Sequence, residues 1–322
     1  MTVWTGRIDA AEGDAARRWH QVVQPLAANQ PAGIALLGFA CDEGVRRNQG
    51  RVGAVAGPVA LRKALANLAY HPTLPLYDAG DVACEDGDLN AAHQRLAAAV
   101  SQNIQAGHLS LVLGGGHETA YGHWLGIADA HPKQRIGIVN FDAHFDLREA
   151  AEATSGTPFA QIAAACAKHG QDFHYLCMGV AETANTQALF ATAERLKAAW
   201  RLDTEMTSWQ LTETTAQLQA FIDQVDVVYL TIDLDVLPAA QMPAVSAPAG
   251  FGVEISVIEH LSRLIAASGK LAAADLVEFN PQFDTDSHGA KAAARLAWAI
   301  TRSFKPLFAT STTPSFPEPN HD

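Results

Sequence analysis

The most constraining feature of the sequence is an apolar run that ends in three ionisable side chains. Residues 135–139 are mostly apolar and β-branched, which indicates a buried strand. Asp142, His144 and Asp146 follow at intervals of two, so on an extended backbone they project from one face. Carboxylates at the end of a buried strand either take up protons or coordinate a cation. A bound metal is the simpler interpretation, and a solvated strand end is the alternative for this motif alone.

Two further apolar runs end in the same kinds of residue. Residues 227–232 lead into Asp233 and Asp235, and residues 109–113 lead into three glycines followed by His117. A lone Asp-x-Asp often caps a helix or a turn, but two such endings after strand-like runs favour a shared site. The glycines permit a tight turn from strand to helix. A phosphate-binding loop is the other interpretation of the glycines, although the Gly-Lys-Ser/Thr ending and the GxGxxG spacing are missing from the sequence.

The chemistry of these candidate ligands favours manganese. The candidates are His117, Glu118, Asp142, His144, Asp146, Asp233 and Asp235, of which Glu118 is the weakest. Oxygen donors dominate and thiolates are missing, which suits Mn²⁺ better than a structural zinc. Four aspartates exceed the charge that one divalent ion needs, whereas two ions about 3.5–4 Å apart would share them around one activated water. The sequence therefore predicts a hydrolase with two Mn²⁺ ions per chain.

The three motifs resemble those of a known family. Gly-Gly-Gly-His-Glu (114–118), Asp-Ala-His-Phe-Asp (142–146) and Asp-Leu-Asp (233–235) resemble, in this order, the signature motifs of the arginase/agmatinase (ureohydrolase) superfamily. The resemblance extends from about Gly33 to Phe304. It implies an arginase-like α/β fold with three layers, α/β/α, around a mostly parallel sheet.

The resemblance also implies which residues hold each ion. One ion would be held by His117, Asp142, Asp146 and Asp233. The other would be held by Asp142, His144, Asp233 and Asp235. Asp146 would in addition pass a proton to the departing nitrogen. Glu278 corresponds to the glutamate that binds the cationic head of the substrate, and a surface glutamate at a strand end is the alternative for it.

The sequence departs from arginases and agmatinases at two positions. Pro238 stands where an aspartate continues the third motif, and Ser155 stands where agmatinases have a histidine usually assigned to proton transfer. These departures, together with residues 45–53 and 145–148, resemble the formimidoylglutamase branch of the superfamily. Enzymes of that branch hydrolyse N-formimino-L-glutamate to L-glutamate and formamide in histidine degradation. Ser155 is then a candidate for substrate binding.

Charge chemistry favours the same branch, because formiminoglutamate has one cationic head and two carboxylates. Arg148 lies two residues beyond Asp146, where arginases have an asparagine that contacts the substrate carboxylate. A guanidinium there would bind a carboxylate through two hydrogen bonds and repel a diamine. Arg46, Arg47 and Arg51 are further candidates for substrate binding, since α/β enzymes commonly build their sites from such loops. A solvated basic loop is the alternative for these three.

Other functions stay open at this point. Arg148 would also suit a ureohydrolase that acts on a guanidino acid such as guanidinobutyrate. A non-enzymatic metal-binding relative would need no complete site, yet all six expected ligands and Glu278 are present. A metallohydrolase of phosphate esters would need basic or amide groups where Glu278 is expected.

The rest of the sequence indicates a single α/β domain at residues 1–309, including an N-terminal extension at 1–32, and a loose tail at 310–322. Apolar strand-like runs alternate with Ala-rich helical stretches, which favours a parallel sheet covered by helices on both faces. The predicted strands are 33–39, 110–113, 136–141, 173–180, 199–202, 227–232 and 271–278. The predicted helices include 58–69, 89–106, 184–197, 212–224, 254–267 and 289–301.

Composition argues against nucleic acid and membranes as partners, and the resemblance implies a small substrate that carries carboxylates. A formal net charge of −12 argues against nucleic acid. No apolar run approaches the roughly 20 residues of a membrane-spanning helix. The polar residues 1–21 do not resemble a secretory signal, and four cysteines without metal-like spacing suggest a reducing compartment, so we expect a cytoplasmic protein. The sequence is compatible with a homo-oligomer but does not determine one.

Overall fold

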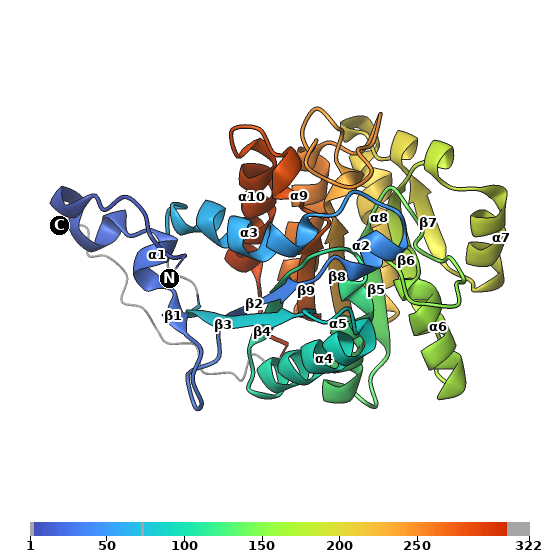
Figure 1. Ribbon diagram of the computed structural model, residues 1–322, viewed down its shortest axis with the longest axis horizontal. Coiled ribbons are helices and arrows are strands. Elements are labelled where there is room, and N and C mark those ends of the chain that lie inside the picture. Colours follow the sequence, from blue (N-terminus) through green and yellow to red (C-terminus); the bar gives the residue numbers. More distant parts are fainter. Residues whose placement is uncertain (1–2, 72–73, 308–322) are drawn as a thin grey trace.

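A nine-stranded sheet with the order β1-β3-β2-β4-β9-β8-β5-β6-β7 forms the centre of the molecule (Figure 1). The computed structural model describes residues 3–71 and 74–307. All recorded pairings between these strands are parallel. The strands are β1 (Gln24–Pro25), β2 (Ile34–Ala40), β3 (Leu76–Ala83), β4 (Leu109–Leu113), β5 (Ile136–Phe141), β6 (His174–Val180), β7 (Ala199–Leu202), β8 (Val227–Asp233) and β9 (Leu271–Val277). The predicted three-layer α/β/α fold with a mostly parallel sheet is confirmed.

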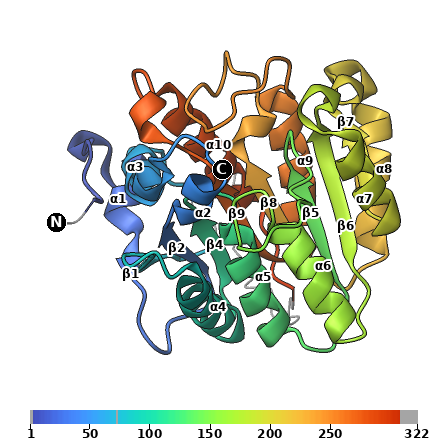
Figure 2. The same ribbon diagram turned by 45° about the vertical axis from the view of Figure 1, so that its right-hand side comes forward.

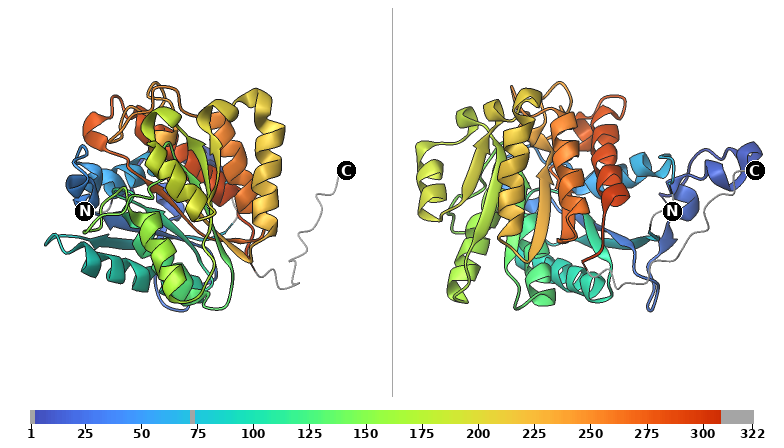
Figure 3. Two further views of the ribbon diagram at one scale, coloured as in Figure 1. Left: turned by 90° about the vertical axis from the view of Figure 1, so that its right-hand side faces the viewer. Right: turned by 180° about the vertical axis from the view of Figure 1, so that it is seen from behind.

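Helices cover both faces of this sheet (Figures 1 and 3). One face carries α3 (Gly57–Ala66), α8 (Leu211–Asp223), α9 (Ile255–Ala267) and α10 (His288–Ser303). The other face carries α4 (Leu89–Gln105), α5 (Thr119–Ala130), α6 (Pro158–Lys168) and α7 (Gln187–Arg195). The short helices α1 (Trp19–Val22) and α2 (Glu43–Arg47) precede α3. Two apolar clusters, one on each side of the sheet, follow from this arrangement.

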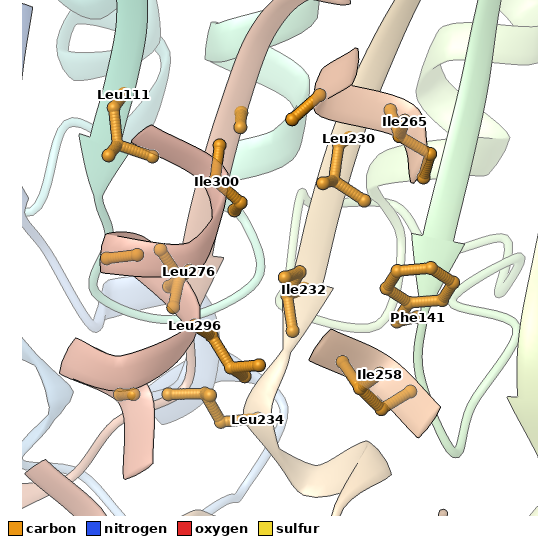
Figure 4. Packing of buried hydrophobic residues seen from close by; sticks show 14 of the residues in the cluster. Leu111, Phe141, Leu230, Ile232, Leu234, Ile258, Ile265, Leu276, Leu296 and Ile300 are labelled. Atoms are coloured by element: carbon orange, nitrogen blue, oxygen red, sulfur yellow. The ribbon is translucent and has the colours of Figure 1, made fainter. Parts of the chain in front are cut away.

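The packing of α9 and α10 shows why the apolar spacing of the sequence produces these layers. Ile258 and Ile265 lie on one face of α9, and Leu296 and Ile300 lie on one face of α10. Figure 4 shows these four side chains packed among Leu230, Ile232, Leu276 and other side chains of the central strands. A helix with apolar residues at intervals of three, four or seven buries such a stripe against a sheet whose strands are apolar throughout.

The predicted strands are confirmed, with ends that differ from the observed ones by at most one residue. The predicted helices are confirmed to within three residues at either end. Strand β3 was not predicted, because Asp78, Gly80 and Asp81 interrupt its apolar pattern. Arg62 of α3, whose side chain is almost fully buried, pairs with both aspartates and so stabilises a strand of low β-propensity.

The single domain at residues 1–309 stays a prediction, although Trp19 in the expected extension is buried in the same apolar cluster as the central strands. The predicted tail at 310–322 lies outside the described residues. Within residues 3–71 and 74–307, no helix is long and apolar enough to cross a membrane.

Truncation of Ile258 to alanine should strongly destabilise the fold. The side chain is fully buried between α9 and the sheet, so its removal leaves a cavity and should lower the free energy of unfolding by about 2–5 kcal/mol. Urea denaturation of the two proteins measures this difference. Trp209, with 92% of its surface exposed, is the control, and Trp209→Ala should change the free energy by less than about 0.5 kcal/mol. Equal effects of the two substitutions would contradict the packing described here.

Candidate metal centre

Four adjacent strands of the sheet bring the predicted site residues together. β4, β9, β8 and β5 are consecutive in the sheet, as Figure 2 shows. His117 follows β4, Glu278 follows β9, Asp233 ends β8, and Asp142 follows β5. Because the strands are parallel, their carboxyl ends meet at one edge, which is where α/β proteins usually bind ligands.

His117 and three aspartates form the first cluster of possible metal ligands. The Nδ1 atom of His117 lies 3.1 Å from Asp142 Oδ2, 3.0 Å from Asp146 Oδ2 and 3.1 Å from Asp233 Oδ2. This nitrogen is buried and has no hydrogen-bond partner. A buried lone pair that faces three carboxylate oxygens fits a divalent cation.

His144 is the centre of a second cluster, which shares Asp142 with the first. The Nδ1 atom of His144 lies 3.1 Å from Asp235 Oδ2 and 3.5 Å from Asp142 Oδ1. Asp142 therefore directs one carboxylate oxygen to each cluster. Asp233 belongs to the first cluster only, and its second oxygen accepts a hydrogen bond from the backbone N–H of Asp235 at 2.9 Å. The predicted bridging of two ions by Asp142 and Asp233 stays a prediction for both residues, and the place of Asp142 in both clusters is compatible with it.

Because these side chains are buried and the aspartates repel one another, their ionised form needs positive charge nearby. Burial, followed by the charges of Asp235 and Asp142, raises the pKa of Asp233 well above its usual range. Burial also raises the pKa of Asp146 and of Asp235. Although burial acts in the opposite direction, the surrounding aspartates raise the pKa of His117 and His144 well above the ordinary value. Two divalent ions would compensate the four carboxylates, so the donor set fits the predicted Mn²⁺ pair.

The backbone is strained at the two predicted catalytic residues. Asp146 has a φ of 49° and Glu278 has a φ of 67°, in the left-handed region that residues other than glycine seldom adopt. The N–H of Glu278 donates to the carbonyl of Gly115 at 2.7 Å, which helps to hold this conformation. Such strain persists where the surrounding structure enforces it, and it is concentrated at functional sites.

Glu278 presents one free carboxylate oxygen beside the aspartates. Its Oε1 atom accepts the backbone N–H of His117 at 2.8 Å, and its Oε2 atom is buried without a partner. Burial, together with the charge of Glu118, raises the pKa of Glu278 to about 8. A cationic N–H group would satisfy this oxygen and favour its ionised form.

A cavity of about 220 Å³ lies over the ligands. It is lined by Asn48, Gly50, His144, Asp146, Arg148, Ser155, Asp233, Asp235, Ser246, Ala247 and Glu278. The structure therefore brings Arg148, Ser155 and Glu278 to one cavity with the metal ligands. A neighbouring cavity of about 480 Å³ is also lined by Arg148, together with Arg47.

Sequence reasoning missed Asn48 and Ser246. Asn48 lies within the segment 45–53 that carries part of the family resemblance, which was the available signal for it. Its side-chain amide donates to the Ser155 hydroxyl at 3.2 Å. Ser246 lies in a loop without a recognisable motif and accepts the backbone N–H of Arg51 at 2.9 Å.

The other predicted arginines lie outside the cavity over the ligands. Arg46 and Arg47 both pair with Glu43, and the side chain of Arg46 is 64% exposed. Arg51 donates to the backbone carbonyls of Val245 and Ser246. These contacts hold the loop that carries Asn48, and contact of the three arginines with substrate stays a prediction.

Glu118, the weakest ligand candidate, belongs to neither cluster. Its buried carboxylate accepts the backbone N–H of Gly44 at 2.9 Å and the thiol of Cys41 at 3.4 Å. Burial raises the pKa of Glu118 to about 7. The residue therefore joins the strand end at His117 to the short helix α2.

Known proteins are similar to this chain over most of its length. A sequence model of the arginase family matches residues 32–302. The chain belongs to the arginase family. A formimidoylglutamase of Chromobacterium violaceum is 74% identical over 305 residues, which are 95% of this chain and 99% of the relative. A formimidoylglutamase of Aeromonas salmonicida is 56% identical over 306 residues, which are 94% of this chain and 98% of the relative.

Solved structures with the arginase-family fold are also similar to this chain. Formimidoylglutamase from Bacillus subtilis has a TM-score of 0.83 and 21% identity, and the match covers 93% of this chain and 94% of that one. Formiminoglutamase from Trypanosoma cruzi, in a crystal structure with Mn²⁺, has a TM-score of 0.76 and 24% identity, with 85% and 95% covered. The family resemblance that the three motifs indicate is therefore confirmed.

Replacement of Asp233 by alanine should remove at least one metal ion. Without this carboxylate, the positive charge of the ions is less compensated, and the first cluster retains three of its four ligands. Elemental analysis after dialysis of the manganese-loaded protein measures the loss. Asp223→Ala, at an exposed position of α8, is the matched control and should leave the metal content unchanged. A full complement of two ions in Asp233→Ala would refute the assignment.

Proposed function

We propose that this chain is a formimidoylglutamase that hydrolyses N-formimino-L-glutamate to L-glutamate and formamide in histidine degradation. The identity of 74% with a relative of that name, over nearly the whole of both chains, is the observation that carries the proposal. The site supports it because one cavity is lined both by a buried carboxylate, Glu278, and by a guanidinium, Arg148. A substrate with a cationic head and anionic ends matches both groups.

Two Mn²⁺ ions are the proposed cofactor. The residues proposed for one ion are His117, Asp142, Asp146 and Asp233, which form the first cluster. Those proposed for the other are the second cluster, Asp142, His144 and Asp235, together with Asp233, which the family resemblance adds. The structure of the Trypanosoma cruzi relative with Mn²⁺ supports this choice of metal. When bound, such a pair lowers the pKa of a water molecule towards neutrality.

Glu278 and Asp146 are the proposed catalytic residues. Because Oε1 of Glu278 is held by the backbone N–H of His117, the free Oε2 atom has a fixed position for the N–H groups of the formimino head. The carboxylate of Asp146 takes a proton from the attacking water and transfers it to the glutamate nitrogen. The bond between that nitrogen and the formimino carbon breaks, and the oxygen of water remains in formamide.

Arg148 and Ser155 are the proposed partners of the substrate carboxylates, with Asn48 in support. The Asn48 amide donates to the Ser155 oxygen, so the single hydroxyl proton of Ser155 is free to donate to an anion. We propose an indirect role for Arg46, Arg47 and Arg51, since each bonds to neighbouring groups of the protein.

A substrate panel with Mn²⁺ tests the proposal. Turnover of formiminoglutamate, guanidinobutyrate, arginine and agmatine should give the highest kcat/KM for formiminoglutamate. Arg148 would also suit guanidinobutyrate, so a preference for that compound would assign the chain to a hydrolase of guanidino acids. No turnover of any of the four would favour a metal-binding protein without this activity.

We also propose that the protein works in the cytoplasm. Cys41, Cys84, Cys166 and Cys177 are all free thiols, which supports a reducing environment.

Replacement of Arg148 by alanine should weaken the use of formiminoglutamate selectively. A hydrogen bond between charged groups contributes roughly 1.5–3 kcal/mol, so kcat/KM should fall about 10- to 150-fold, mainly through KM. Steady-state kinetics with formiminoglutamate and with a carboxylate-free amidine of similar length measure the selectivity.

Arg135→Ala is the control for Arg148→Ala, since Arg135 is exposed, forms a surface ion pair with Asp226 and lies outside the cavity over the ligands. It should change kcat/KM by less than about threefold, as expected for the loss of an exposed ion pair. Equal losses on both substrates in Arg148→Ala would show that Arg148 supports the metal ligands rather than the substrate.

A further inference from the structure

The two ring nitrogens of His117 have different surroundings. Nδ1 faces the aspartates, whereas Nε2 lies 3.1 Å from the hydroxyl oxygen of Thr231. Both residues are buried. A histidine that offers Nδ1 to a metal carries its proton on Nε2, so Nε2–H must donate to the Thr231 oxygen.

Thr231 can donate a hydrogen bond of its own to a neighbouring side chain of β8. Its oxygen accepts from His117, which leaves its own proton free to donate. Tyr229 lies two residues earlier on the same face of the strand, and its hydroxyl lies near that of Thr231. The Tyr229 hydroxyl in turn lies 2.5 Å from Asp275 Oδ2, where it donates to the carboxylate.

Asp275 is the last of these polar groups. Its Oδ2 atom also lies 2.6 Å from Nδ1 of His123 on α5, and all three side chains of this group (Tyr229, Asp275 and His123) are fully buried. Thr231 of β8 and Asp275 of β9 are paired in the sheet, which fixes their separation. Because an ionised carboxylate only accepts hydrogen bonds, the Tyr229 hydroxyl must donate to it, which leaves the Tyr229 oxygen able to accept.

We propose that the buried series His117–Thr231–Tyr229–Asp275 is a positioning device for the metal-binding histidine. Each hydroxyl donates towards Asp275, so His117 keeps its proton on Nε2 and presents Nδ1 to the ion. None of Thr231, Tyr229 and Asp275 belongs to a ligand cluster. The series concerns metal affinity and does not depend on which amidine is the substrate.

The same polar groups could instead serve the stability of the core alone. Buried hydroxyl groups that are hydrogen-bonded also stabilise the folded state. A purely structural role predicts a lower free energy of unfolding in variants without any change in metal affinity. The affinity for Mn²⁺, measured on variants and wild type from which the metal has been removed, therefore distinguishes the two explanations.

Calorimetric titration of metal-free protein with Mn²⁺ provides the test. Thr231→Val removes the acceptor for His117 while preserving the branched shape, and it should weaken binding of the ion at His117 about 10- to 100-fold. Thr231→Ser retains the hydroxyl and should restore the affinity to within about threefold. The affinity for the ion at His144 should change less, because the ring of His144 contacts Asp142 and Asp235 rather than Thr231.

Tyr229→Phe tests the more distant part of the series and is independent of the folding of Thr231→Val. It should weaken the binding of the ion at His117, by less than Thr231→Val does. Tyr77→Phe is the matched control, since Tyr77 of β3 donates its hydroxyl proton to the carbonyl of Pro31, away from the site. Urea denaturation shows which variants are folded. Wild-type affinity for both ions in a folded Thr231→Val or Tyr229→Phe protein would overturn the proposal.

Discussion

Buried negative charge at the carboxyl ends of four central strands is the constraint on which the rest of the site depends. Asp142, Asp146, Asp233 and Asp235 lie beside two histidines in two clusters that share Asp142. In a medium of low dielectric constant, such a group is stable only if protons or cations compensate it. Folding of the strand ends and metal binding are therefore linked, and the surrounding polar contacts serve to hold the ligands in place.

The cavity beside this centre combines two kinds of recognition. The free oxygen of Glu278 is suited to a cationic head, and Arg148 is suited to a carboxylate. A substrate that carries both charges can bind both groups, whereas the guanidinium repels a diamine. The loop that carries Asn48 closes one side of this cavity and is held by the contacts of its own arginines and of Glu118. The loop beside the cavity is thus fastened to the strand end that carries His117.

The order of the strands explains how residues far apart in the sequence form one site. β4 and β5 follow one another in sequence, but β9 and β8 lie between them in the sheet. This insertion brings Glu278 between His117 and the aspartates of β8. It also pairs Thr231 with Asp275, so that polar groups inside the sheet continue from the metal ligand to the core.

The sequence by itself determined the parallel α/β architecture, most strand ends and the set of possible ligands. Apolar runs with polar endings are local patterns, and a spacing of two residues places side chains on one face whatever the rest of the chain does. Tertiary structure alone decided β3, where the buried Arg62 compensates two aspartates, and the roles of Asn48 and Asp275. It also turned Arg46 and Arg51 towards neighbouring groups of the protein. Each of these depends on a contact between distant segments, and such contacts follow from strand order and burial, which no local pattern specifies.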